Sequence, residues 1–280
     1  MLTRMTGRLL LCATPIGNLG DASGRLRSAL DTADLVYAED TRRAAKLLSA
    51  LDVHTPVRSY FVGNEQQRAG ELRRRLDAGE TVAVISDAGM PSIADPGLSA
   101  VQVAEQAGAE VSVVPGPSAV TTALAASGLP AERFVFEGFL PRRGGERRRR
   151  IEALRQEQRT TVLFSGKSRV VADLTDLAAV LNGDRRIVVA RELTKVFEEL
   201  WKGTLDESVT YWASQQLRGE FTLVIAGAAQ ETHVSIDRTV ARVADAIDAG
   251  ESMADAVRRI ASESGINRRQ LYEAVLNDRQ

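Results

Sequence analysis

Two loops in the first half of the chain combine residues that suit ligand binding through the backbone. The apolar residues 82–85 lead into Ser-Asp-Ala-Gly-Met-Pro-Ser-Ile-Ala-Asp-Pro-Gly at residues 86–97, and residues 111–114 lead into Pro-Gly-Pro-Ser at residues 115–118. Glycine and proline keep side-chain bulk low, so backbone N–H and C=O groups can face a ligand. In open parallel sheets, ligands bind beyond the carboxyl ends of the strands. The pattern therefore indicates a binding site. From the pattern alone, ordinary strand-to-helix turns explain the two loops equally well.

Two charged segments could order a loop or bind an anion. Residues 39–43, Glu-Asp-Thr-Arg-Arg, follow the apolar residues 35–38, and a helix cap at Asp40 or Thr41 with a surface ion pair is the simple interpretation. Residues 142–150 hold six arginines at the start of an expected helix. Positive charge at that end opposes the helix dipole, so the cluster favours an anionic partner over a merely solvated surface.

Composition and the remaining motifs narrow the class of protein. The formal net charge of −1 gives no overall nucleic-acid signature, and the single Cys12 excludes a disulfide framework and a cysteine-based zinc site. Residues 166–168, Gly-Lys-Ser, are not a P-loop, because Thr161 stands where that motif needs glycine. The apolar run at residues 9–13 is too short for a secretion signal or a membrane span. We therefore expect a cytoplasmic protein without a membrane or metal partner.

The elements that position these loops predict two α/β domains and a helical segment. Strand and helix patterns alternate up to residue 127, which predicts a mainly parallel sheet in a first domain, residues 1–130. A second domain, residues 131–228, should mix strand directions, because the connection around residues 201–204 is too short for a helical crossover. Residues 237–280 show only helical periodicity. Their turn at Gly-Ile-Asn resembles a helix-turn-helix, and a capping bundle with a solvated basic face is the alternative.

Five segments, in the same order along the chain, resemble the motifs of the ribosomal RNA small subunit methyltransferase I family, within the tetrapyrrole methylase-like superfamily. They are residues 14–21, 39–42, 86–97, 115–119 and 136–141. The resemblance implies methylation of the ribose 2′-hydroxyl of a cytidine in 16S ribosomal RNA of the small subunit. It also implies that S-adenosylmethionine binds in a cleft between two α/β domains and that the protein is a homodimer. The expected substrate is the RNA within the assembled small subunit.

The resemblance assigns site residues motif by motif. Those expected to contact the cofactor from the first domain are Pro15, Ser86, Asp87, Ala88, Gly89, Met90, Ser92, Ile93, Ser118 and Ala119. Those expected from the second domain are Phe139, Leu140, Arg191, Glu192, Leu193 and Thr222. Residues expected to contact RNA are Asp40, Arg42, Arg142, Arg143, Arg147 and Arg148. Asp40 and Arg42 could instead order the loops of the first domain.

The chain departs from the family pattern at residues 165–169. The segment Ser-Gly-Lys-Ser-Arg stands where family members commonly carry an aromatic residue, a Glu and a Pro-His pair. Any role of that Glu or His in the family therefore cannot be assigned to this chain.

Catalysis of methyl transfer needs alignment of donor and acceptor, which can supply about 7–11 kcal/mol, and a base for the hydroxyl, worth about 10²–10⁴-fold. The chain has two histidines, neither of them in a motif, so a histidine base is not expected. The candidates are Asp40, Asp87, Glu192 and Glu198, with Lys195 as a cation for the developing alkoxide. The preferred pair is Lys195 with Glu198, which share the segment Thr-Lys-Val-Phe-Glu-Glu.

Two other functions compete with RNA methylation. A tetrapyrrole C-methyltransferase of the same fold would bind a polycarboxylate that also suits arginine, although the segments Thr-Pro-Ile-Gly-Asn and Glu-Asp-Thr-Arg argue against it. A helix-turn-helix regulator that senses a small ligand would bind duplex DNA and transfer no methyl group. Methyl transfer to ribosomal particles separates the three.

Overall fold

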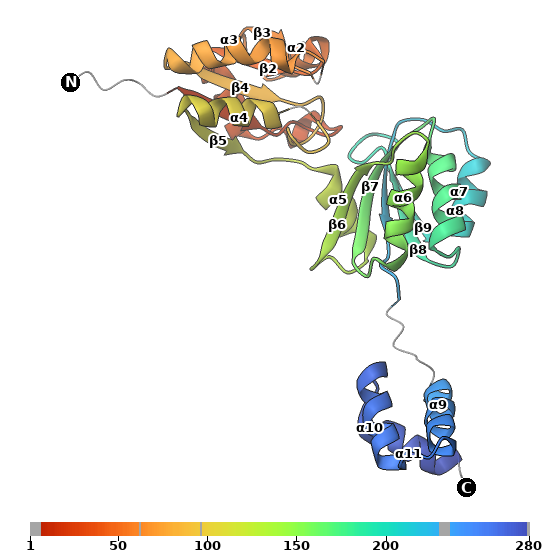
Figure 1. The fold of residues 1–280 in the computed structure, drawn as a ribbon. Coiled ribbons are helices and arrows are strands. Elements are labelled where there is room, and N and C mark those ends of the chain that lie inside the picture. The colour runs from red at the N-terminus through yellow and green to blue at the C-terminus, as the bar shows by residue number, and fades with distance from the viewer. Residues whose placement is uncertain (1–6, 62, 96, 230–235, 279–280) are drawn as a thin grey trace. The chain divides into compact units, whose positions relative to one another are not determined.

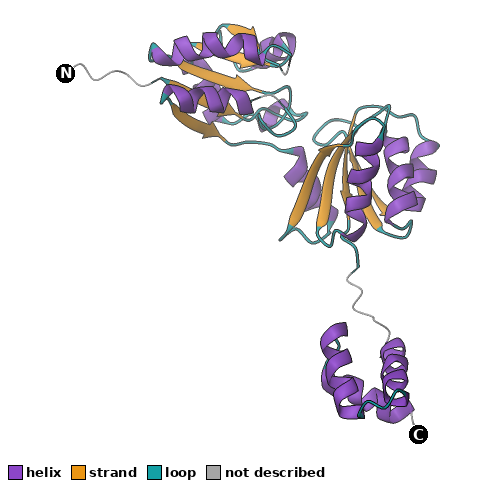
Figure 2. Ribbon diagram, viewed as in Figure 1, coloured by secondary structure: helices purple, strands orange, loops and turns teal. Residues whose placement is uncertain are grey.

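The computed structural model describes residues 7–61, 63–95, 97–229 and 236–278. The chain divides into one compact unit up to Ala228 and a second from Ala229 to Gln280. The first unit is α/β with two five-stranded sheets, and the second contains helices without strands in its described part (Figures 1 and 2). None of the helices in the described ranges has the length and apolar character needed to cross a membrane.

The first sheet is parallel, as predicted, and has the order β3-β2-β4-β1-β5. Its strands are β1 (Arg8–Cys12), β2 (Leu35–Ala38), β3 (Val57–Ser59), β4 (Thr81–Ile85) and β5 (Glu110–Val114). One face packs on α1 (Gly24–Thr32) and α2 (Thr41–Ala50), and the other on α3 (Glu65–Asp77) and α4 (Leu98–Ala107). Because helices cover both faces, the central strands are apolar on both sides, which is why they read as continuous hydrophobic runs.

The second sheet mixes strand directions, also as predicted, and has the order β6-β7-β10-β8-β9. Its strands are β6 (Phe134–Phe139), β7 (Thr160–Gly166), β8 (Arg186–Arg191), β9 (Glu199–Thr204) and β10 (Glu220–Ile225). Strands β6 and β7 are parallel, β10 is antiparallel to both of its neighbours, and β8 and β9 form an antiparallel pair. The helices α6 (Gly145–Ala153), α7 (Val170–Leu181) and α8 (Leu205–Ala213) belong to this half, with short 3₁₀ turns at Leu19–Asp21 and Leu154–Gln156 in the unit.

Helix α5 (Ala119–Ser127) packs on the second sheet, although the boundary predicted at residue 130 placed it in the first domain. Its side chains Val120 and Leu124 share a core cluster with Val162, Val188 and Val224 of strands β7, β8 and β10. The helix is rich in small apolar residues, so its sequence predicts a buried helix but not the sheet that buries it. The segment between β5 and α5 therefore connects one sheet to the other.

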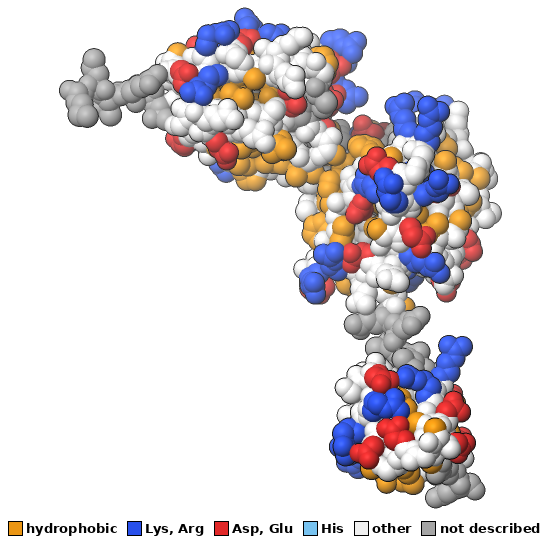
Figure 3. Space-filling view, in the orientation of Figure 1, with side chains coloured by type: hydrophobic (Ala, Val, Ile, Leu, Met, Phe, Trp, Pro, Cys, Tyr) orange, Lys and Arg blue, Asp and Glu red, His pale blue; other side chains and the backbone are white. Residues whose placement is uncertain are grey.

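The second unit consists of α9 (Ile236–Asp248), α10 (Met253–Ser264) and α11 (Arg268–Asp278), which confirms the three helices predicted. Its core is built from its own helices, with Val243, Val257, Ile260 and Leu271 among the most buried side chains. Its described residues include six arginines and eight Asp or Glu, and four of the arginines form ion pairs within the unit. Blue and red side chains accordingly alternate on its surface in Figure 3. This balance does not favour the DNA-binding regulator.

Arg147 corrects the predicted RNA-contacting cluster, because its side chain is only 6% exposed. Its guanidinium lies 2.8 Å from Oδ1 of Asp173 and 2.6 Å from Oδ2 of Asp176, and it donates to the carbonyl of Pro141. The other oxygen of Asp173 accepts a 2.6 Å hydrogen bond from Ser165. Arg147 thus compensates a buried carboxylate, so we leave it out of the proposed RNA surface. Arg142, Arg143 and Arg148 are exposed.

The burial of Arg147 predicts a large cost on its removal. Arg147→Ala leaves Asp173 buried and without its closest cation, and we expect a loss of about 3–5 kcal/mol in the free energy of unfolding. Arg148→Ala, the neighbouring exposed arginine on the same helix, should stay within about 0.5 kcal/mol of wild type. Urea unfolding of the two variants measures both values. Equal losses would show that the Arg147–Asp173 pair does not stabilise the fold.

Candidate active site

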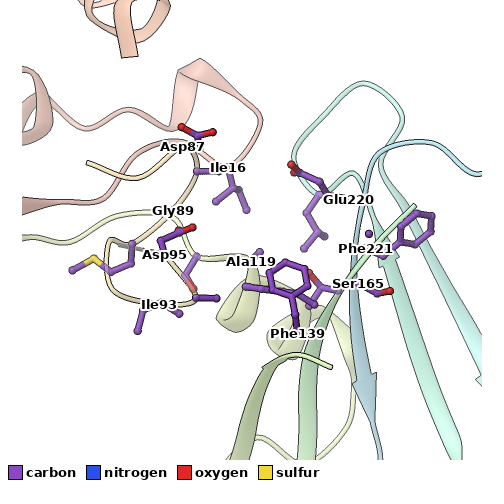
Figure 4. Close-up of a pocket in the computed structure, with 18 of the residues that line it drawn as sticks. Ile16, Asp87, Gly89, Ile93, Asp95, Ala119, Phe139, Ser165, Glu220 and Phe221 are labelled. Carbon is purple, nitrogen blue, oxygen red and sulfur yellow. The ribbon is translucent and has the colours of Figure 1, made fainter. Parts of the chain in front are cut away.

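A cavity of about 420 Å³ in the first unit is lined by residues of both halves (Figure 4). Its volume lies in the range of small-molecule and cofactor sites. The lining residues from elements up to α5 are Ile16, Glu39, Arg43, Asp87, Ala88, Gly89, Met90, Ile93, Ala94, Asp95, Ser118 and Ala119. Those from the second sheet and its loops are Phe139, Phe164, Ser165, Gly166, Ala190, Leu193, Lys195, Glu220, Phe221 and Thr222.

The wall from the first sheet is formed by loops at the carboxyl ends of β1, β2 and β4, where parallel sheets bind ligands. The loop after β4 is joined to the loop after β1 by two backbone hydrogen bonds, from Thr14 N to Gly89 O at 2.9 Å and from Gly89 N to Thr14 O at 3.1 Å. Gly89 has a φ of +83°, a backbone conformation that side chains disfavour. Ser92 and Ala94 adopt φ values of +73° and +62° without being glycine. The loop is therefore held in a strained conformation against the cavity.

The opposite wall includes the loop between β8 and β9, which approaches the loop after β1 closely. A side chain at Gly17 would lie 2.4 Å from Cγ of Lys195 and 2.9 Å from the carbonyl oxygen of Leu193. Glu192 and Thr194 in this loop have φ values of +53° and +65°. Only glycine at position 17 permits this close approach, so the loop after β1 and the loop between β8 and β9 pack directly against each other.

An aromatic surface forms another part of this wall. Phe139 is 55% exposed, and its ring centroid lies 5.5 Å from that of Phe164, which in turn contacts Phe136 at 5.0 Å. Figure 4 shows Phe139 beside Ala119, with Ser165 and Phe221 beyond it. An exposed aromatic ring at the edge of a cavity suits stacking against a flat heterocycle.

Most of the residues predicted to bind the cofactor line this cavity. They are Asp87, Ala88, Gly89, Met90, Ile93, Ser118, Ala119, Phe139, Leu193 and Thr222, and Lys195 from the predicted catalytic pair joins them. The structure does not place Pro15, Ser86, Ser92, Leu140, Arg191, Glu192 or Glu198 among the lining residues. Pro15 and Ser86 instead line a neighbouring cavity of about 280 Å³, together with Asp40.

Several predicted residues that do not line the cavity have identifiable structural roles. Ser86 donates a 3.1 Å hydrogen bond to the carbonyl of Gly89, and Leu140 is buried in the core of the second sheet. Arg191 forms a 2.8 Å ion pair with Glu199 and lies over the ring of Trp212. Asp40 caps α2 and pairs with Arg42 at 2.8 Å, as the cap interpretation predicted.

The predicted pair of Lys195 and Glu198 is not an ion pair in the structure. Nζ of Lys195 lies 2.7 Å from Glu192 and 2.9 Å from Glu220. The carboxylate of Glu198 accepts a hydrogen bond from the backbone N–H of Thr194 and so closes the turn. Burial alone would lower the pKa of Lys195, but the hydrogen bonds to Glu192 and Glu220 outweigh it and raise the pKa, which keeps the lysine charged.

The structure also adds lining residues that were not predicted. They are Ile16, Glu39, Arg43, Ala94, Asp95, Phe164, Ser165, Gly166, Ala190 and Glu220. Phe221, which the resemblance grouped with Thr222, also lines the cavity. The signal was present for some of them, since Glu39 and Arg43 lie in the charged segment after β2, and Ala94 and Asp95 in the loop after β4. Ser165 and Gly166 belong to the segment that departs from the family pattern, so the resemblance could not assign them.

Four carboxylates line the cavity, and they fall into two classes. Asp87 lies 3.4 Å from Arg43, and Glu220 lies 2.9 Å from Lys195. Glu39 and Asp95 form no ion pair with any residue that the structure describes. Burial and the nearby Asp87 raise the pKa of Glu39, and burial and the nearby Glu39 raise the pKa of Asp95 to about 7. Within the described ranges, no three His, Cys, Asp or Glu side chains are placed to hold a metal ion.

The fold is that of the tetrapyrrole methylase family. A family model described as "Tetrapyrrole (Corrin/Porphyrin) Methylases" matches residues 8–208. The solved structure of a diphthine synthase covers 79% of the chain with a TM-score of 0.62 at 17% identity, over 90% of its own length. A uroporphyrin-III C-methyltransferase from Thermus thermophilus, solved in complex with S-adenyl homocysteine, covers 79% with a TM-score of 0.55 at 19% identity, over 97% of its length. At such identities the structures establish the fold alone.

Sequence relatives identify the branch of this superfamily. The "Ribosomal RNA small subunit methyltransferase I" of Mycobacterium tuberculosis is 48% identical over 98% of this chain and 96% of its own. The protein of the same name from Thermotoga maritima is 42% identical over 221 residues, which are 79% of this chain and 99% of its own. The chain belongs to the ribosomal RNA small subunit methyltransferase I family.

The raised pKa of Asp95 predicts a pH-dependent effect on stability. Between pH 3.8 and about 7 the folded chain keeps a proton on Asp95 that the unfolded chain releases, so the wild type loses stability as pH rises through this window. Asp95→Asn removes this loss. The difference in Tm between Asp95→Asn and wild type should therefore grow with pH and level off above about 7. Thermal unfolding across pH 4–8 tests this, with Asp31→Asn on the exposed face of α1 as the control. A difference that does not change with pH would contradict it.

Proposed function

We propose that the protein methylates the ribose 2′-hydroxyl of a cytidine in 16S ribosomal RNA, with S-adenosylmethionine as the methyl donor. The observation that carries the proposal is that the motifs shared with the family, at residues 86–97, 115–119 and 136–141, contribute to one cavity. Family membership supports a methyl transfer to small-subunit RNA. The cytidine and the 2′-oxygen are the finer part of the proposal.

The cavity suits a donor that combines positive charge with a flat heterocycle. S-adenosylmethionine supplies an electrophilic methyl group on a positively charged sulfur. Glu39 and Asp95 offer carboxylates without an ion-pair partner in the described part of the chain, so a cationic ligand would complement them. Phe139 offers an exposed ring for the adenine, and the loop after β4 offers backbone groups. We assign cofactor contacts to Asp87, Ala88, Gly89, Met90, Ile93, Ser118, Ala119, Phe139, Leu193 and Thr222.

Catalysis in this proposal relies on position and charge. The loop after β4 and the loop between β8 and β9 hold donor and acceptor in line, which is the larger part of the acceleration. Lys195 presents a fixed cation at the cavity wall, where it can stabilise negative charge that develops on the acceptor oxygen. Glu198 holds the turn that carries Lys195 and takes no part in the chemistry.

The RNA contact is proposed for exposed arginines near the end of β6. Arg142, Arg143 and Arg148 are exposed and follow Phe139, which lines the cavity. Their charges would contact phosphates and position the strand without reading its sequence. Arg42, with its side chain 87% exposed beside Asp40, is a further contact. We also propose a cytoplasmic homodimer that acts on the assembled small subunit.

The experiment that tests this function measures methyl transfer from labelled S-adenosylmethionine to small ribosomal subunits from a strain without this gene. We expect one labelled nucleoside per particle, identified by mass as 2′-O-methylcytidine. Naked 16S RNA and small subunits from the parent strain serve as controls. Cofactor binding without transfer to any ribosomal particle would contradict the proposal and favour the tetrapyrrole C-methyltransferase.

Lys195 and Glu198 should respond differently to substitution. Lys195→Ala removes a cation from the cavity wall and should lower kcat by about 10²-fold, the scale of losing one stabilising donor. Glu198→Gln keeps an oxygen that accepts the hydrogen bond from Thr194, so kcat should stay within a few-fold of wild type. Single-turnover transfer to small subunits measures both. An equal loss in the two variants would support the predicted Lys195–Glu198 pair.

A further inference from the structure

Asp95 is a carboxylate of the cavity that is not among the residues assigned above to cofactor or RNA contacts. It lies in the loop after β4, on the side of the cavity that also carries Gly89 and Ile93, and Glu220 and Phe221 lie on the opposite side (Figure 4). We propose that Asp95 is the base that accepts the proton of the acceptor hydroxyl during methyl transfer. The proposal rests on the proposed function for the reaction itself.

The ion pairs of the cavity single out two carboxylates that can act as a base. Asp87 lies 3.4 Å from Arg43 and accepts a 2.9 Å hydrogen bond from the backbone N–H of Asp40. Glu220 lies 2.9 Å from Lys195. A cation beside a carboxylate stabilises its ionised form and makes it a weaker base. Asp87 and Glu220 are therefore already engaged by a cation, which leaves Glu39 and Asp95 as the carboxylates of the cavity without an ion pair among the described residues.

Backbone geometry favours Asp95 over Glu39. Two positive-φ residues, Ser92 and Ala94, lie three positions and one position before Asp95, so the chain maintains a strained loop at this place. Strain of this kind persists where the surrounding structure requires a fixed side-chain position, and it gathers at functional sites. Glu39 instead continues from the end of strand β2, next to the helix cap Asp40.

The charges around Asp95 tune it for proton transfer near neutral pH. The groups that raise its pKa to about 7 are, after burial, the carboxylates of Glu39 at the end of β2, Asp87 in its own loop and Glu220 on β10, and a hydrogen bond with Ser86 opposes them. The cations of the cavity, Arg43 and Lys195, are each already paired with a carboxylate. A base works best when its pKa lies near the working pH, so Asp95 meets this condition.

The proton balance of the step is simple. The O–H bond of the ribose hydroxyl breaks and its proton moves to a carboxylate oxygen of Asp95, while the hydroxyl oxygen forms a bond to the methyl carbon. The carbon–sulfur bond breaks, and its electron pair stays on sulfur, which becomes neutral. Asp95 then releases the proton to water. Positive charge lost at sulfur equals the charge of the released proton, so no further reactant is needed.

Glu39 has a distinct role in this scheme. The negative charge of Glu39 repels that of Asp95, and among the neighbouring groups it raises the pKa of Asp95 the most. Removing its charge should therefore make Asp95 a stronger acid without removing the base. This gives a readout that a purely structural role for Asp95 would not produce.

The test is the pH dependence of kcat on small subunits under saturating S-adenosylmethionine, from pH 5.5 to 9. In the wild type we expect kcat to rise with one ionisation at or below about pH 7, because the positive charge of bound S-adenosylmethionine favours the ionised carboxylate. Asp95→Asn should lose about 10²–10⁴-fold in kcat and also lose this rise. Glu39→Gln should keep the rise but move it to lower pH. Asp31→Asn, an exposed aspartate on α1, is the control and should reproduce the wild-type profile.

Each outcome either supports or overturns the base. The proposed base would be overturned if kcat of Asp95→Asn still rose with pH as in the wild type. It would also be overturned if Glu39→Gln left the pH midpoint of this rise unchanged. If Asp95→Asn does not fold, the midpoint in Glu39→Gln decides alone. Calorimetric titration with S-adenosylmethionine separates a loss of cofactor binding from a loss of proton transfer. Absence of methyl transfer in the wild type would refute the proposed function, whereas an active wild type with an unchanged variant profile would refute only the role of Asp95.

Discussion

The packing of α5 against the second sheet holds the two walls of the cavity together. Because the chain leaves β5 and places its next helix on the other sheet, the turn at residues 115–118 connects the two halves beside the cavity. Ile16, from the loop after β1, joins the same core cluster as Val120 and Leu124. The close approach of Gly17 to Lys195 adds a second contact. The cavity therefore depends on hydrophobic contacts that also stabilise the fold.

Strain and unpaired charge gather where the reaction is proposed. Of the six non-glycine residues with positive φ in the described part of the chain, Ser92, Ala94, Glu192 and Thr194 lie in the two loops that flank the cavity. The same loops present Asp95 and Lys195. Each feature costs folding free energy, and the well-packed cores of the two sheets can offset that cost. Such a distribution is expected when selection favours a preorganised site.

The sequence predicts those parts of the site that depend on local pattern. Strand ends, the glycine and proline loops and the parallel first sheet follow from periodicity and turn chemistry, and so the loop at residues 86–97 was placed correctly at the cavity. The burial of Arg147 could not be predicted, because its partners Asp173 and Asp176 come from α7, which is distant in the sequence. Within the arginine run, nothing in the local sequence distinguishes the buried arginine from the exposed ones. Asp95 was missed for a related reason: Glu39 and Glu220, which act on it, come from strands far apart in the sequence.

The helical C-terminal unit has a consequence for how far the parts of the chain depend on one another. Its buried apolar side chains come from α9, α10 and α11, so the unit has a hydrophobic core of its own. The T. maritima relative matches over 221 residues, which are 99% of its own length and 79% of this chain. The core of the helical unit therefore does not depend on the two sheets whose loops form the cavity.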